Sequence, residues 1–175
     1  MGLIEDLSQA IGAVPEMHQF ALLIGAEGSH LGQSALLAEV LGREDGPPPP
    51  VDLEAERRHG AFILENRELI GAATDLSDGG LALAAFEMAA AAGIGLRLER
   101  GDTAFLFGED QARYLVAASL DQAEALARAG AQAGIAVQVV GRFGGDTVRL
   151  GSAEAPMAEL LAAWRGGFAK ALGVT

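Results

Sequence analysis

Ala73-Thr74-Asp75-Leu76-Ser77-Asp78-Gly79-Gly80-Leu81 joins an apolar run that predicts a strand to one long enough for a helix. We expect Asp78 to cap that helix, because its carboxylate can accept a hydrogen bond from a free backbone N–H of the first turn. Gly79 and Gly80 carry no side chain, so another backbone or a ligand can come close. Such a junction either binds an anion or simply starts a tightly packed helix, and these residues leave both interpretations open.

Strand-like and helix-like segments are mixed along the rest of the chain. Strands are expected at Phe20–Ala26, Leu69–Thr74, Ile94–Glu99, Tyr114–Ser119, Ala136–Phe143 and Thr147–Leu150. Helices are expected after Ser34 through Leu41, after an Asp52 cap, and at Gly79–Ala92, Asp121–Ala133 and Met157–Leu172, whereas Thr103–Phe107 fits either type. This order predicts an α/β protein of the α+β type, with a mixed sheet flanked by helices. We interpret residues 1–19 as a lead-in segment and residues 20–175 as one domain, because the four prolines at 47–50 are too few to separate two domains.

Composition excludes several classes of protein. Half of the 175 residues are hydrophobic, which is too apolar for a disordered chain. The net charge of −12 argues against nucleic acid and anionic membranes as partners. The chain has no cysteine, so disulfides and thiolate sites are excluded, and a cytoplasmic location is expected. The only lysine, Lys170, is far from any glycine-rich segment, which argues against a P-loop.

Three segments could carry a site. Gly25–Ser34 is a glycine-rich loop before a helix and suits a phosphate, with Ser34 or Ser29 as a hydroxyl donor, although the spacing alone favours a plain structural connection. The acids of Asp75–Gly80 could hold magnesium together with a phosphate, or could cap the helix, which we prefer. In Phe107–Tyr114, Arg113 could bind a phosphate, while the alternative is a solvated turn with a local ion pair. No catalytic triad and no preformed metal site can be argued.

The same segments resemble the C-terminal, AIR synthase-related (PurM-like) domain of the phosphoribosylformylglycinamidine synthase family. The matching stretches, in order, are Leu22–Gly25, His30–Ser34, Gly42–Leu53, Asp75–Leu81, Phe107–Tyr114 and Gly141–Asp146. The resemblance runs from about Leu3 to Ala171. It implies a domain of an ATP-dependent ligase of purine biosynthesis, in which formylglycinamide ribonucleotide and ammonia from glutamine become formylglycinamidine ribonucleotide. It also implies ATP and Mg²⁺ in the full enzyme, the N-terminal domains of the same synthase as partners, and glutaminase and small accessory subunits.

The resemblance further implies roles for individual residues. Substrate or phosphate binding is expected at Gly32, Gln33, Ser34, Glu109, Gln111 and Arg113. The role of Glu109–Gln111 is carried over by the internal symmetry of the family. Asp75, Ser77, Asp78, Gly79 and Gly80 would shape the site. No catalytic residue and no metal ligand is expected in this chain, which we expect to be inactive alone and to self-associate through an exposed apolar patch. The alternatives are a non-catalytic scaffold domain that holds a structural nucleotide, or a relative such as aminoimidazole ribonucleotide synthetase.

Overall fold

A single mixed sheet organises the computed structural model, which describes residues 6–173. Its strands lie in the order β2-β4-β1-β5-β3-β6-β7, and every neighbouring pair is antiparallel except β3 and β6. Their bounds are Phe20–Ile24 (β1), Ala72–Asp75 (β2), Leu96–Leu98 (β3), Tyr114–Ala118 (β4), Val137–Phe143 (β5), Thr147–Leu150 (β6) and Ala153–Pro156 (β7). The expected mixed sheet flanked by helices is confirmed.

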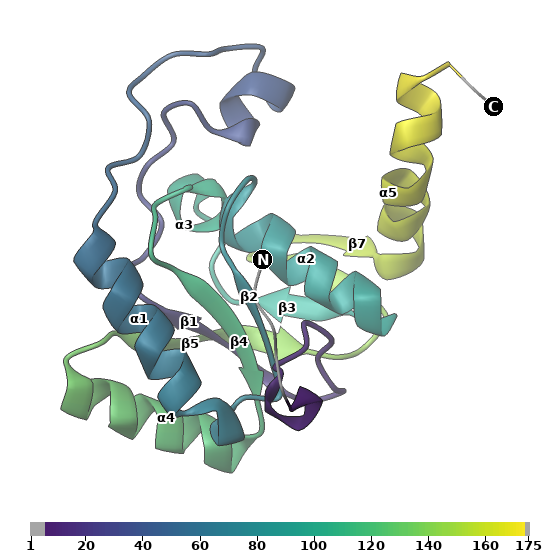
Figure 1. Ribbon diagram of the computed structural model, residues 1–175. Coiled ribbons are helices and arrows are strands. Elements are labelled where there is room, and N and C mark those ends of the chain that lie inside the picture. Colours follow the sequence, from purple (N-terminus) through teal and green to yellow (C-terminus); the bar gives the residue numbers. More distant parts are fainter. Residues whose placement is uncertain (1–5, 174–175) are drawn as a thin grey trace.

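Helices cover both faces of this sheet (Figure 1). Their bounds are Leu53–Glu65 (α1), Gly80–Ala92 (α2), Thr103–Phe107 (α3), Leu120–Ala133 (α4) and Met157–Ala171 (α5), with 3-10 turns at Leu7–Gln9 and Arg67–Leu69 and a π-helical turn at Leu36–Val40. Helices α1 and α4 pack on one face and α2 on the other, so each face of the central strands is buried.

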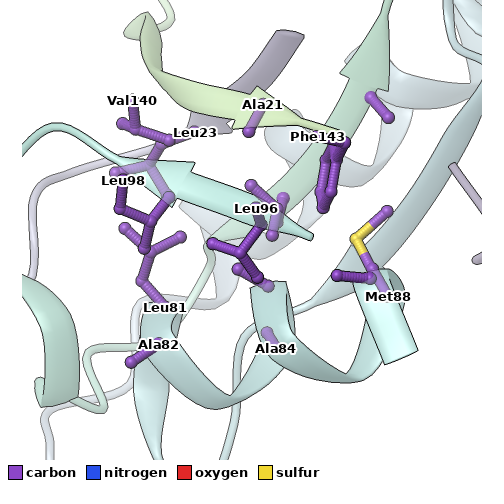
Figure 2. Close-up of a cluster of buried hydrophobic side chains, with 14 of the residues drawn as sticks. Ala21, Leu23, Leu81, Ala82, Ala84, Met88, Leu96, Leu98, Val140 and Phe143 are labelled. Atoms are coloured by element: carbon purple, nitrogen blue, oxygen red, sulfur yellow. The ribbon is translucent and has the colours of Figure 1, made fainter. Parts of the chain in front are cut away.

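The core beneath α2 is built from small side chains. Leu81 and Met88 of α2 meet Leu23, Leu96 and Phe143 from three strands (Figure 2). Alanines fill most of the other buried positions of α2, so the helix can lie close to the sheet. Because α2 consists mostly of alanines and other apolar residues, the sequence predicts it as a buried helix.

Local capping signals account for most of the correctly predicted boundaries. The Asp52 carboxylate accepts hydrogen bonds from the backbone N–H of Glu54 and Ala55, both at 3.0 Å, as expected for the cap of α1. Gly134 follows α4 in the left-handed conformation with φ of 65°, as expected. The ambiguous residues 103–107 form a helix, because the Asp102 carboxylate accepts from Phe105 N.

Three expectations were wrong in detail. The turn after Ser34 is π-helical rather than a regular helix. Strand β7 was not predicted, because Ala153–Pro156 contains no β-branched or aromatic residue and pairs only at the sheet edge. Asp78 does not cap α2, as described below. The division into a lead-in of residues 1–19 and a domain of residues 20–175 stays a prediction, and residues 1–5 and 174–175 lie outside the described part.

Candidate functional site

The three motif segments of the sequence meet in one place. Residues 108–113 (the 108–113 turn) lie against residues 25–35 (the glycine loop) and against the start of α2. The carboxylate of Asp110 accepts hydrogen bonds from Ser29 N and Ser29 Oγ, both at 2.7 Å, and from His30 N at 2.9 Å. In return, Glu109 N donates to the His30 carbonyl oxygen at 2.9 Å. These hydrogen bonds hold the glycine loop against the 108–113 turn.

Glu109 connects two helix starts with one oxygen atom. Its Oε1 accepts hydrogen bonds from Ala35 N and Gly79 N, both at 2.8 Å, and only 8% of the residue is exposed. Ala35 precedes the π-helical turn, and Gly79 precedes α2. A buried carboxylate is stabilised when donors surround it, and the positive end of a helix dipole adds to this. Glu109 therefore fixes the glycine loop relative to α2.

The expected Asp78 cap is corrected by the same contact. Gly79 occupies the cap position of α2 with φ of 76° and has no side chain that could cap the helix, and Asp78 is exposed. The free N–H of Gly79 is satisfied from 30 residues away along the chain by Glu109. An acceptor that lies 30 residues away cannot be recognised from the sequence around the helix start. The nearest acid, Asp78, was therefore predicted as the cap.

The side chain of Arg113 lies beneath the backbone of the 108–113 turn, and only 1% of the residue is exposed. Its Nε donates to the Asp110 carbonyl oxygen at 2.9 Å and its Nη2 donates to the Gly108 carbonyl oxygen. Burial lowers the pKa of Arg113 against the opposing charges of Asp110 and Glu109. Its Nη1 is buried and has no hydrogen-bond partner. The guanidinium is thus directed into the protein, which corrects the alternative of a solvated turn, while phosphate binding by Arg113 stays a prediction.

The pKa of Asp110 departs from its ordinary value. Partial burial alone would raise the pKa of Asp110, but hydrogen bonds from His30, from Ser29 and the charge of Arg113 outweigh burial. The pKa of Asp110 is therefore lowered. The carboxylate stays ionised to lower pH than a free aspartate, and its hold on the glycine loop is kept over the same range.

The predicted phosphate residues of the glycine loop also make internal contacts. Ser34 is fully buried, and its Oγ accepts from Leu37 N at 3.3 Å. Gln33 has φ of 56°, and its Nε2 donates to the carbonyl oxygens of Glu44 at 3.1 Å and Gly46 at 3.0 Å. A Cβ on Gly32 would lie 2.6 Å from the Pro47 carbonyl oxygen. Gln33 and Gly32 therefore contact the segment that ends in the prolines, whereas Ser34 contacts the π-helical turn.

The exposed part of the site is made by other predicted residues. Asp75, Ser77 and Asp78 at the entry to α2 are exposed, and so is Gln111, whose Nε2 donates weakly to the Glu109 carbonyl oxygen at 3.4 Å. Their side chains are available to a ligand or a neighbouring domain. Among residues 6–173 no group of three or more His, Asp or Glu side chains is arranged to hold a metal ion.

A second set of contacts, which sequence analysis missed, supports the 108–113 turn from α1. Ala112 has φ of 57°, its N–H donates to Glu56 Oε1 at 2.7 Å, and its carbonyl oxygen lies 2.7 Å from His59 Nδ1. Tyr114 Oη donates to Glu56 Oε2 at 3.3 Å, and burial with the nearby charge of Glu56 raises the pKa of Tyr114. The only sequence signal is the spacing of three between Glu56 and His59, which places both on one side of α1.

Tyr114 also borders a hollow of about 610 Å³. Its lining includes Ile11, Gly60, Leu64 and Asp75, so it lies between α1 and the edge strand β2.

No helix among residues 6–173 has the length and apolar character needed to cross a membrane.

Comparison with known proteins shows the family to which this chain belongs. The family described as AIR synthase related protein, C-terminal domain, matches residues 21–151. Phosphoribosylformylglycinamidine synthase subunit PurL of Cereibacter sphaeroides is 60% identical over 99% of this chain and 24% of its own length. The same subunit of Ruegeria pomeroyi is 58% identical over 98% of this chain and 24% of its own length. The chain thus spans about a quarter of the length of these curated relatives.

Solved structures support the fold. Thermotoga maritima PurL complexed with FGAR has a TM-score of 0.70 at 20% identity, covering 89% of this chain and 30% of that one. Thiamine-monophosphate kinase of Stenotrophomonas maltophilia has a TM-score of 0.56 at 18% identity, covering 78% of this chain and 51% of that one. These identities are low, so the likeness concerns the fold alone.

Proposed function

Since this chain belongs to the family described as AIR synthase related protein, C-terminal domain, we propose that it is a domain of a phosphoribosylformylglycinamidine synthase. The observation that carries the proposal is the 60% identity to a PurL subunit over 99% of this chain. The proposed activity of the whole protein is the ATP-dependent conversion of formylglycinamide ribonucleotide and ammonia to formylglycinamidine ribonucleotide. Thermotoga maritima PurL has been obtained with FGAR and with ATP, and in a structure named PurLQS, in keeping with such a substrate, nucleotide and additional subunits.

Within that enzyme we assign this domain a positioning role. Glu109, Asp110 and Arg113 hold the glycine loop and the start of α2 through internal contacts. We propose that the residues that bind ATP and Mg²⁺ lie mainly in the other parts of the synthase. We propose that contact with a ligand falls on the exposed Gln111, Asp75, Ser77 and Asp78.

A chimeric enzyme tests this function. The quarter of Cereibacter sphaeroides PurL that matches this chain is replaced by residues 1–175, and the product is measured from formylglycinamide ribonucleotide, ATP and ammonia. We expect turnover within about tenfold of the parent enzyme, because most neighbours at the exchanged position are retained. A folded chimera that makes no product, while the parent enzyme does, would refute the proposal.

A scaffold without ligand contact is the second candidate, favoured by one observation. The Oε1 of Glu109, which symmetry within the family assigns to substrate, is already bound by two backbone N–H groups. Gln111→Ala in the chimera separates the two functions, because Gln111 is exposed and its replacement leaves the core intact. A raised KM for the ribonucleotide indicates ligand contact, whereas unchanged KM and kcat indicate a scaffold.

A further inference from the structure

The outer half of α5 exposes large apolar side chains. Met157 at its start is buried and Leu161 is half-buried, but Trp164 is 52% exposed and Phe168 77% exposed. Leu172, directly after the helix, is 61% exposed. Figure 1 shows α5 leading away from the sheet, so its outer turns have no neighbour among the described residues.

These residues lie on one side of the helix. Leu161, Trp164, Phe168 and Leu172, which we call the apolar stripe, are spaced by three or four residues, the repeat that aligns side chains in an α-helix. Glu159 and Lys170 lie on the opposite side by the same geometry. The helix is therefore amphipathic, and its apolar side is the uncovered one.

The stripe continues into the body of the protein. The ring of Trp164 meets the ring of Phe86 of α2 edge to face, with centroids 6.1 Å apart. Beside them is an apolar hollow of about 230 Å³, lined by residues that include Leu83, Phe107, Leu150 and Leu160. The stripe and the hollow form one apolar surface across α5, α2 and β6.

The helix itself requires packing to be stable. It contains Gly166 and Gly167 in succession, with open space around both Cα atoms. A glycine in a helix interior lowers helix stability relative to alanine, and a helix of this length is marginal in water even without such glycines. The sequence thus specifies an apolar stripe on a helix that its own chain leaves uncovered.

The size of the surface indicates what covers it. The stripe's exposed side chains offer on the order of 400 Å² of apolar area, given that a large aromatic buries 150–250 Å². Two free copies of a protein need about 800 Å² each for a stable dimer, so a second copy is disfavoured. A domain of the same polypeptide needs less area, because the linker keeps it at high effective concentration.

The length of a related subunit indicates that such a further domain exists in the whole synthase. This chain aligns over 99% of its own length to only 24% of the Cereibacter sphaeroides subunit, so about three quarters of that polypeptide lies outside it. We propose that the apolar stripe and the adjoining hollow are the surface on which another domain of the same synthase packs through apolar side chains. The inference rests on the proposed function.

Cysteine labelling tests the contact, because the chain has no cysteine of its own. Ala171→Cys places a thiol beside the stripe, and Ala162→Cys places a matched one on the far side of α5. Both alanines are exposed. Labelling by a maleimide is followed by peptide mass spectrometry, in the isolated chain and in the chimera with Cereibacter sphaeroides PurL.

We expect both thiols to label at similar rates in the isolated chain. In the chimera, Ala171→Cys should label at least tenfold more slowly while Ala162→Cys keeps its rate, and adding Phe168→Ser should restore fast labelling. Equal rates for both thiols in the chimera, or slowing in the isolated chain that grows with its concentration, would overturn the inference. The labelling rate does not depend on turnover, so an inactive but folded chimera refutes the proposed function and leaves this test valid.

Discussion

The 108–113 turn and α5 use their residues in opposite ways. In the 108–113 turn, Glu109 and Arg113 are buried and Asp110 is half-buried, and the chain supplies nearly all of their hydrogen-bond partners. In α5, apolar side chains are exposed and find few partners in this chain. A buried polar group without a partner is costly, so the turn had to be completed locally. Exposing an apolar side chain costs little free energy in the separate domain. The apolar side chains of α5 can therefore be covered by another part of a larger protein.

The largest expected effect comes from Glu109→Ala in the 108–113 turn. It leaves Ala35 N and Gly79 N without their acceptor in a buried place, so we expect a loss of about 3 kcal/mol in the free energy of unfolding. Urea denaturation followed by circular dichroism measures this. Glu124→Ala on the exposed surface of α4 is the control, with an expected change below about 0.5 kcal/mol. A similar small change for both variants would mean that Glu109 does not connect the two helix starts.

Glycine substitutions should have opposite consequences in the two regions. A Cβ at Gly28 would lie 2.5 Å from the Ala104 carbonyl oxygen and 3.0 Å from Arg113 Nη1, so Gly28→Ala should cost about 2 kcal/mol of unfolding free energy. Gly166→Ala in α5 meets no atom within 4 Å and should instead raise the helical signal in circular dichroism. The contrast fails if Gly28→Ala is as stable as the parent chain.

A smaller effect concerns pH and Asp110. Its pKa is lowered in the folded protein, so its contribution to stability is present above the unfolded value of about 3.9 and is lost as pH falls through the lower folded value. Asp110→Asn should therefore be less stable than the parent at pH 6 and approach it in stability near pH 2. Thermal unfolding of both chains across this range gives the comparison. A difference that is constant with pH would exclude the carboxylate as its source.

The smallest effect is expected from Phe168→Ser in the isolated chain. This side chain is 77% exposed, so its removal should change the free energy of unfolding by less than about 0.5 kcal/mol. Differential scanning calorimetry is sufficient for the measurement, with Lys170→Ser on the opposite side of α5 as the control. A loss above about 2 kcal/mol would show that Phe168 packs within this chain after all.

Sequence reasoning located the elements whose signals are local. The Asp52 cap, the Gly134 stop and the apolar pattern of α2 each depend on residues within a few positions of one another. The same reasoning found the three segments of the site, because glycines and acids cluster at the ends of predicted strands. It missed β7, whose composition is unsuited to strands and which forms because the Ala153–Pro156 backbone pairs with β6.

The roles of the site residues did not follow from the sequence, because they depend on partners far along the chain. Glu109 was expected to face a ligand, and instead its Oε1 joins Ala35 and Gly79, which are 74 and 30 residues away. Ala112 with positive φ, held by Glu56 and His59, had no recognisable pattern at all.

Residue order alone therefore established the mixed α/β architecture, the family resemblance and the three segments that matter, since periodicity, caps and glycine turns are properties of neighbours. Tertiary packing established which acids are buried, which helix start each one serves, and that the apolar stripe of α5 is uncovered. The physical reason is that burial and hydrogen bonding depend on segments that are remote in sequence and meet only in the folded protein. The sequence alone does not distinguish a carboxylate that contacts water from one that contacts a ligand or a helix N-terminus.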